Sequence, residues 1–234
     1  MLPPKTQTLY MGSINMRTKY HRALRQKLAK TVLSVLCAMS LAGLAGCDSV
    51  SGLLGSPIAQ FNSTSIENAD FGQDFHLHDF NGQARSLADF RGKAVLIFFG
   101  YTHCPDICPT ELARAASAIK LLGDAGKQVQ VLFVTLDPQR DTPEVLRNYV
   151  PAFHPDFLGL YGSEAETKAV SATFRVFYQK TAIGNATGDY AIDHSVFSYI
   201  FDPEGKLRLL VSHELAAEAL AADLRKILGK PSKK

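Results

Sequence analysis

The stretch that decides the fold is AVLIFFGYTHCPDICPTEL, residues 94–112. Its first nine residues form a nearly continuous apolar run, which is typical of a strand buried on both faces of a sheet. Residues 105–122 then show helical periodicity, and their apolar side chains share one side: Leu112, Ala115, Ala116, Ile119 and Leu122. Cys104 and Cys108 lie where strand and helix meet. The segment therefore predicts a buried strand that leads into a helix with two thiols at its start.

The elements around this segment alternate in the same way. They are a hairpin at 74–87 around Asn81-Gly82, a second buried strand at 129–137, a helix at 142–153 with Thr142 as N-cap, a short strand at 158–162, a helix at 163–175, a hairpin at 195–213 and a helix at 214–228. This order predicts an α/β domain with a mixed central sheet flanked by helices. A cysteine pair at the end of the first buried strand resembles the thioredoxin-like fold, here with an N-terminal β-hairpin.

The first fifty residues indicate export from the cytoplasm. Basic residues without acidic ones extend to Lys30, an apolar run follows from Thr31 to Leu44, and LAGC ends at Cys47. This order is typical of a secretory signal, and the apolar run is shorter than the ~18 residues of a spanning helix. LAGC resembles the lipobox of bacterial lipoproteins. We therefore predict a signal peptide at 1–46, lipidation of Cys47 and a flexible tether at 47–70; an uncleaved signal anchor is the alternative.

The predicted cleavage changes both the cysteine count and the charge. Cys37 leaves with the signal and Cys47 carries lipid, so Cys104 and Cys108 are the remaining thiols and form one site. The whole chain has 25 Lys and Arg against 22 Asp and Glu; removal of the seven basic residues before Cys47 leaves 18 against 22. The folded domain, predicted at 71–229 with a basic tail at 230–234, is thus mildly acidic, and nucleic-acid binding is not expected.

Two thiols four residues apart are consistent with either a metal site or a disulfide. Pro105 suits the first helical position, and Pro109 is expected to distort the opening turn so that the regular helix begins near Thr110. Residues four apart on a helix have Cβ atoms about 5–6 Å apart, which lets two sulfurs converge on one ion. A disulfide needs about 3.5–4.5 Å. The spacing favours a metal and leaves the redox pair open.

A histidine supplies the third candidate ligand. Thioredoxin-like reductases resemble one another in a proline just before the strand that faces the cysteines, and here Asp193-His194-Ser195 take that place. Two thiolates and an imidazole suit Cu(I), and the imidazole also supports Cu(II). Zinc is the competing metal. The polar segment 178–193 is predicted to be a mobile loop insertion that moves His194 onto the metal and away from it.

Three blocks together resemble the SCO/SenC family of copper proteins. They are FFGYTHCPDICPTEL at 98–112, VTLDPQRDTPEVLRNYV at 134–150 and DYAIDHSVFSYIFDPEGKL at 189–207. The similarity extends over roughly residues 71–228. It implies Cys104, Cys108 and His194 as copper ligands, and a metallochaperone that helps to assemble the CuA centre of cytochrome c oxidase subunit II. An upstream periplasmic copper donor is also expected. Asp48 directly after Cys47 resembles an inner-membrane retention signal, which places the protein at the bacterial inner membrane, facing the periplasm.

The alternatives differ in chemistry. A thiol–disulfide oxidoreductase would use Cys104 to attack and Cys108 to resolve, whereas the metallochaperone is a binding protein and not an enzyme. A peroxidase of the same fold does not match the proline-flanked pair. Asp137, Asp141 and His103 are candidates for tuning the site or contacting the partner; for the two aspartates, turn formation and N-capping are the structural alternative.

Overall fold

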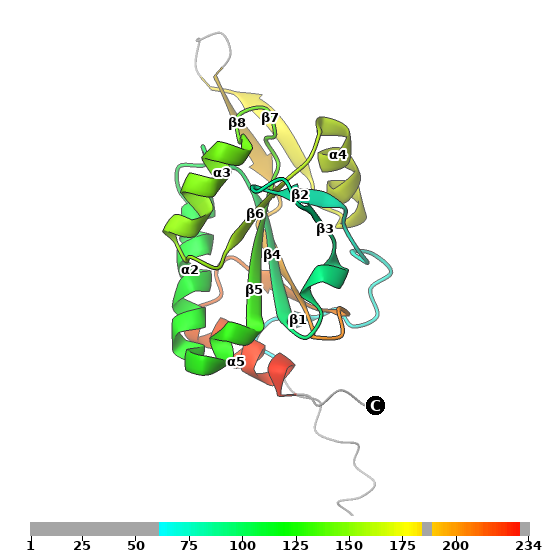
Figure 1. Ribbon diagram of the computed structural model, residues 1–234, viewed down its shortest axis with the longest axis vertical. Helices are drawn as coiled ribbons and strands as arrows, with labels where there is room; N and C mark the ends of the chain where they lie inside the picture. The colour runs from blue at the N-terminus through cyan, green and yellow to red at the C-terminus, as the bar shows by residue number, and fades with distance from the viewer. Residues whose placement is uncertain (1–60, 184–188, 230–234) are drawn as a thin grey trace, which may run out of the picture. The chain divides into compact units, whose positions relative to one another are not determined.

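The computed structural model describes residues 61–183 and 189–229 (Figure 1). The predicted signal peptide, Cys47, the tether before residue 61 and the basic tail lie outside the described residues. The strands of the larger sheet are β1 (Thr64–Ser65), β2 (Leu77–Asp79), β3 (Ala84–Arg85), β4 (Ala94–Gly100), β5 (Val129–Thr135), β6 (Leu158–Tyr161), β9 (Phe197–Phe201) and β10 (Leu207–Ser212). They lie in the order β1-β10-β9-β4-β5-β6-β2-β3. The predicted mixed central sheet is confirmed.

The centre of the sheet is built from the apolar runs. β4 and β5 pair in parallel, and all seven residues of each are buried. β6 extends the parallel part beside β5, and β9 pairs antiparallel with the other edge of β4. Helices cover both faces of this centre, which explains why its strands read as continuous rather than alternating apolar sequence.

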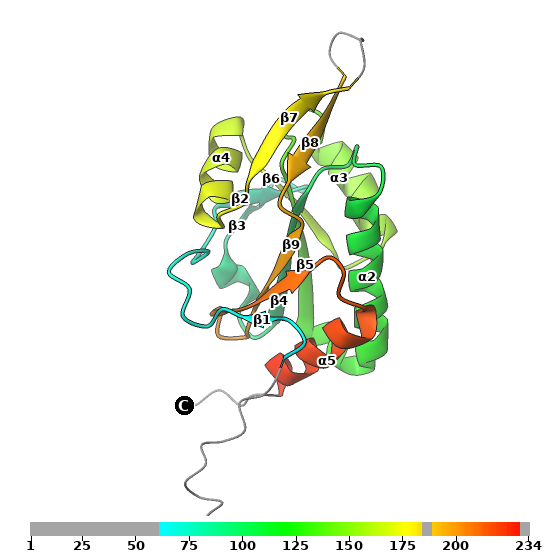
Figure 2. The same ribbon diagram turned by 180° about the vertical axis from the view of Figure 1, so that it is seen from behind.

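Helices pack on the two faces of the sheet (Figures 1 and 2). They are α2 (Ile107–Leu122), α3 (Pro143–Tyr149), α4 (Glu164–Thr173), α5 (Ala217–Leu228) and the 3₁₀ helices η1 (Leu87–Phe90), η2 (Gly123–Gln128) and η3 (Val150–Ala152). Leu112 of α2 and Leu224 of α5 belong to one apolar core, whereas Val170 of α4 belongs to the core on the opposite face. The sheet is therefore the middle of three layers, and the expected helices on both faces are confirmed.

Local signals placed several element ends correctly. The Thr142 hydroxyl accepts a hydrogen bond from the Val145 amide, as predicted for an N-cap. The helix from Pro143 ends at Tyr149 instead of 153 and continues as η3, because Pro151 has no N–H to donate to the carbonyl four residues earlier. Both hairpins turn at glycines in the left-handed region, Gly82 and Gly205.

Two predicted segments differ in structure. The insertion that carries His194 is not a loop: β7 (Tyr178–Ala182) and β8 (Tyr190–His194) form a separate antiparallel ribbon, with residues 184–188 outside the described residues. Part of the expected tether is also folded, because β1 pairs with β10 and residues 62–63 bind Asp223 of α5. The domain therefore begins before residue 71. In the described ranges, no helix is long and apolar enough to cross a bilayer.

Candidate metal centre

The two cysteines lie between β4 and α2, and both are free thiols. Cys104 precedes the helix and is partly exposed, whereas Cys108 lies in the first helical turn and is fully buried. Gly100, the last residue of β4, leaves room for the Cys108 sulfur, because a Cβ atom at position 100 would lie 2.8 Å from Cys108 Sγ. The junction thus holds one thiol inside the domain and presents the other near the surface.

The helix begins at Ile107, so the expected positions of Pro105 as first helical residue and of a regular start near Thr110 are wrong. Pro109 is the third helical residue after the N-cap Asp106, where a backbone N–H has no acceptor within the helix. A proline therefore costs no hydrogen bond there. Cys104 Sγ accepts a hydrogen bond from the Cys108 amide at 3.5 Å. This cap-like contact, and not four-residue spacing within a helix, brings the thiols together.

The two thiols have opposite acidities. The pKa of Cys104 is lowered to about 3, first by a hydrogen bond from the Cys108 side chain and further by the amides of Cys108 and Asp106, against the opposing effect of burial. The pKa of Cys108 is raised by the hydrogen bond to Cys104 and by burial. Cys104 is therefore a thiolate, and Cys108 remains a protonated thiol whose S–H donates a hydrogen bond to that thiolate.

His194 closes the site from the ribbon. As the last residue of β8, it places Nε2 3.7 Å from Cys108 Sγ. Its Nδ1 lies 2.9 Å from the Ser195 carbonyl oxygen, which can only accept, so Nδ1 carries the ring proton. The ring also makes edge contacts with Tyr101 and Phe98, with centroids 6.0 and 6.2 Å away. The lone pair of Nε2 therefore faces Cys108 Sγ.

These donors fit a soft metal ion. An ion about 2.3 Å from a thiolate and about 2.0 Å from an imidazole separates the two donors by roughly 3.5–3.7 Å at tetrahedral to trigonal angles. Cys108 Sγ and His194 Nε2 meet this distance. Within the described residues, no three His, Cys, Asp or Glu side chains are already placed around a common metal position. The three groups contact one another instead. Because a thiol binds a metal ion only after losing its proton, metal binding must displace the Cys108 proton.

Asp141 supports the cysteine loop and does not face the metal position. Its carboxylate is fully buried and accepts hydrogen bonds from the Thr102 amide at 3.0 Å, the Thr102 hydroxyl at 2.5 Å and the Thr135 hydroxyl at 2.6 Å. Burial raises the pKa of Asp141, and these hydrogen bonds oppose the rise. His103 is half exposed and directs Nδ1 to the Thr102 hydroxyl and Asp141, at 3.2 and 3.8 Å. Both residues therefore fix the turn before Cys104.

Asp137 connects a different pair of elements. It is buried, accepts from the Arg140 guanidinium, and accepts from the Tyr190 hydroxyl of β8 at 2.7 Å. Sequence patterns did not identify Arg140 or Tyr190, because neither belongs to a ligand motif and their contact joins residues 50 apart. The charged run DPQRD before the Thr142 cap was the one available signal.

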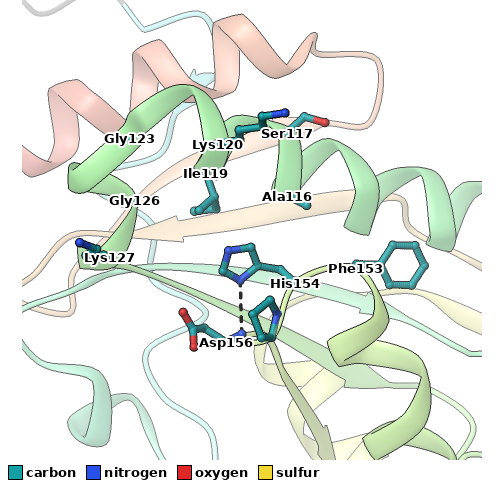
Figure 3. A pocket seen from close by; sticks show the side chains of 11 residues that line it. Ala116, Ser117, Ile119, Lys120, Gly123, Gly126, Lys127, Phe153, His154 and Asp156 are labelled. Carbon is teal, nitrogen blue, oxygen red and sulfur yellow. Dashed lines mark hydrogen bonds between the residues drawn. The ribbon is translucent and has the colours of Figure 1, made fainter.

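A surface pocket of about 620 Å³ lies away from the thiols, between the second half of α2 and the loop before β6 (Figure 3). The His154 ring stands in it below Ile119, and its Nδ1 accepts a hydrogen bond from the Asp156 amide at 3.3 Å. Lys120 and Lys127 lie at its edge. None of the three candidate ligands lines this pocket, so it is separate from the candidate metal centre at the strand–helix junction.

The chain is similar in sequence to one known protein family. Residues 63–229 match the family model described as SCO1/SenC. A SCO2-like protein of Rickettsia felis is 36% identical over 185 residues, which cover 77% of this chain and 89% of that protein. The mitochondrial SCO2 homologue of Homo sapiens is 39% identical over 170 residues, or 71% of this chain and 64% of the human protein. The chain thus spans somewhat less than two thirds of that mitochondrial relative.

Solved structures give the same result. Bradyrhizobium japonicum ScoI with copper bound is 38% identical, with a TM-score of 0.61, and the match covers 67% of this chain and 99% of that one. Yeast Sco1 with copper bound is 33% identical, with a TM-score of 0.64, over 70% of this chain and 92% of that one. Two copper-bound proteins therefore share this fold.

Proposed function

We propose that this chain, which belongs to the SCO1/SenC family, is a copper metallochaperone that holds its cargo with Cys104, Cys108 and His194. Two solved relatives above 30% identity carry copper, which supports the choice of metal. Thiolate donors favour Cu(I), and the imidazole nitrogen supports Cu(II). The protein binds and delivers the ion, and no catalytic step is needed for this task.

One observation carries the proposal: the unprotonated Nε2 of His194 faces Cys108 Sγ at 3.7 Å. A histidine with a merely structural role has no need to direct its lone pair at Cys108, a thiol that is itself hydrogen-bonded to the Cys104 thiolate. Its Nδ1–H is held by the Ser195 carbonyl, the kind of outer contact that fixes the tautomer and orientation of metal-binding histidines.

The residues divide the work of capture and release. Cys104, already a thiolate and partly exposed, makes the first contact with an incoming ion. Cys108 follows by losing its proton, so copper uptake releases protons and is stronger at higher pH. Cys104 is also the ligand that a recipient's thiolates can reach most readily. We infer that delivery proceeds by stepwise replacement of ligands, beginning at Cys104.

The recipient and the location belong to the same proposal. We infer that copper goes to the CuA site of cytochrome c oxidase subunit II and comes from an upstream periplasmic copper donor. The LAGC sequence ending at Cys47 supports a lipid anchor, and Asp48 directly after it supports retention at the inner membrane, where the domain would face the periplasm.

The test is an anaerobic titration of reduced full-length protein, in detergent, with Cu(I) in competition with a chromophoric chelator. We expect one copper per chain, and His194→Ala should weaken its binding by more than roughly tenfold, because outer contacts of metal ligands alone are worth about 10–100-fold. His154→Ala, a distant histidine, is the matched control and should bind like the parent. Equal affinity of His194→Ala and the parent would exclude His194 as a ligand. A parallel Zn²⁺ titration decides between the metals.

A thiol–disulfide reductase is the second candidate, favoured by the low pKa of Cys104. Its thiolate would attack a partner's disulfide, forming a mixed disulfide and releasing one partner thiolate. Cys108 would then lose its proton and attack Cys104, leaving a Cys104–Cys108 disulfide and the reduced partner, a transfer of two electrons. Incubation of Cys108→Ser with an oxidised CuA domain should trap the mixed disulfide. Absence of any adduct would leave the metallochaperone as the one remaining candidate function.

A further inference from the structure

We propose that Asp137, Arg140 and Tyr190 form a clamp that positions His194 against the cysteine pair. This inference rests on the proposed copper site and identifies positioning residues for it. The three residues touch no metal donor themselves. They act by tying the turn after β5 to the start of β8, the strand that ends in His194.

The ribbon needs such a tie because it is not part of the larger sheet. Among the described strands, β8 pairs with β7 alone, in a register that sets Tyr178 opposite His194. No ladder of backbone hydrogen bonds therefore fixes the ribbon against β4 or β5. Figure 2 shows β7 and β8 projecting beyond the end of the larger sheet. Side-chain contacts must set the position of the ribbon relative to the thiols.

Tyr190 provides three of these contacts. Its hydroxyl donates to Asp137 Oδ1 at 2.7 Å, its backbone carbonyl accepts from Arg140 Nη1 at 3.0 Å, and its ring lies under the Arg140 guanidinium with 3.7 Å between Cζ and the ring centroid. Asp137 in turn accepts from Arg140 Nε. Each member therefore contacts the other two, and the planar guanidinium satisfies a carboxylate, a carbonyl and an aromatic face together.

The other side of the clamp is fixed to the cysteine loop. The Asp141 amide donates to the Asp137 carbonyl at 2.9 Å, while the Asp141 carboxylate holds Thr102, two residues before Cys104. The Asp137 amide also donates to the Thr135 hydroxyl, which is bonded to the same carboxylate. The turn 137–141 thus holds the cysteine loop with one end and the histidine strand with the other.

The geometry makes His194 sensitive to the clamp. Tyr190 and His194 are four residues apart on one strand, so they share a face and lie about 13 Å apart along it. A small rotation at Tyr190 therefore displaces the imidazole, and Nε2 is the donor that must meet the metal. The clamp should affect copper binding through His194 and hardly at all through the thiols.

The experiment is a double-mutant cycle on Cu(I) affinity with full-length protein. Tyr190→Phe keeps the ring but removes the bond to Asp137, and should weaken Cu(I) binding about tenfold. Tyr161→Phe, a half-buried tyrosine of β6, is the matched control and should have no effect. In the His194→Ala background, Tyr190→Phe should cause no further loss. Arg140→Lys keeps the charge but not the planar fork, and should behave like Tyr190→Phe.

A second readout separates positioning from folding. The thiolate-to-Cu(II) charge-transfer band should shift in Tyr190→Phe and be the same in His194→Ala with and without Tyr190→Phe. Equal losses of affinity from Tyr190→Phe in both backgrounds would overturn the clamp, since the residue would then act on the fold or the thiols. If His194→Ala itself binds copper like the parent, the copper site fails first. The two failures are therefore distinguishable.

Discussion

The cysteine half of the site (residues 94–112) and the histidine half (residues 178–194) are held by different means. β4 is buried along all seven residues, and Cys108 packs against its last glycine in the apolar core. In the histidine half, four of the five residues of β7 are exposed, and β8 pairs only with β7 among the described strands. The first half belongs to the core, whereas the second is a ribbon secured by polar contacts and by one core residue, Ile192.

The two halves therefore differ in how easily they can be displaced. Displacing a core residue breaks many packing contacts together, so the thiols cannot move without a large cost in stability. Ile192 is the one residue of β7 and β8 that is buried, and so few buried side chains are typical of regions that open locally at low free energy. In the proposed copper site, the fixed half would therefore define where the ion binds, and the adjustable half would tighten or relax the hold on it. The following predictions test that contrast.

The largest expected effect concerns the acidity of Cys104. With its pKa held at about 3, its alkylation by iodoacetamide should change little between about pH 7 and pH 5, whereas a thiol with the ordinary pKa of 9.0 would slow by roughly 100-fold. Mass spectrometry of the native reduced protein should find Cys104 modified and Cys108 untouched. A tenfold slowing per pH unit in the parent would contradict the assignment.

A smaller effect is expected from crowding the fixed half. Gly100→Ala would bring a methyl group to 2.8 Å from Cys108 Sγ and 2.9 Å from a ring carbon of Phe133. Overpacking of this kind costs about 1–3 kcal/mol. Urea unfolding should show that loss, while Gln179→Ala on the exposed ribbon should stay within about 0.5 kcal/mol. Equal stabilities for the two variants would mean that the cysteine half is not the rigid one.

The smallest effect should appear in the adjustable half on metal binding. If His194 contributes about tenfold to copper affinity, copper stabilises the closed ribbon by the same factor, so exchange of the amides at 191–194 should slow about tenfold. The amides of β4 should not change and are the internal reference. Hydrogen exchange of apo and copper-loaded protein measures both. Unchanged ribbon protection would show that His194 does not join the metal from a mobile position.

Sequence reasoning reached the two halves unequally for physical reasons. The cysteine half could be predicted because its buried strand and helix have a recognisable local sequence pattern: a continuous apolar run followed by helical periodicity. The start of α2 was missed because Pro109 is tolerated as a third helical residue only once the N-cap is known to be Asp106. The ribbon was missed because β7 is almost entirely exposed and β8 buries only Ile192, so YQKTA and YAIDH resemble a polar loop.

Long-range polar contacts were beyond the sequence altogether. Arg140 and Tyr190 are 50 residues apart, and Asn62 and Asp223 are 161 residues apart. Nothing local distinguishes such residues from solvent-exposed ones. The low-charge segment at 61–70 therefore suggested a tether, although its Asn62 and Ser63 are hydrogen-bonded to the buried carboxylate of Asp223. The three candidate ligands could be proposed from sequence motifs and the family resemblance, but the contacts that orient them needed the fold.

The bonds between residues 62–63 and α5 also have a mechanical consequence. Asp223 accepts four hydrogen bonds of 2.8–2.9 Å from Asn62 and Ser63, and β1 pairs with β10 directly after them. In Figure 2, β1 lies at the opposite end of the domain from the β7–β8 ribbon. A pull on the chain before Phe61 would load α5 and the edge of the sheet first. The three proposed copper ligands would then be shielded from tension applied to the chain before Phe61.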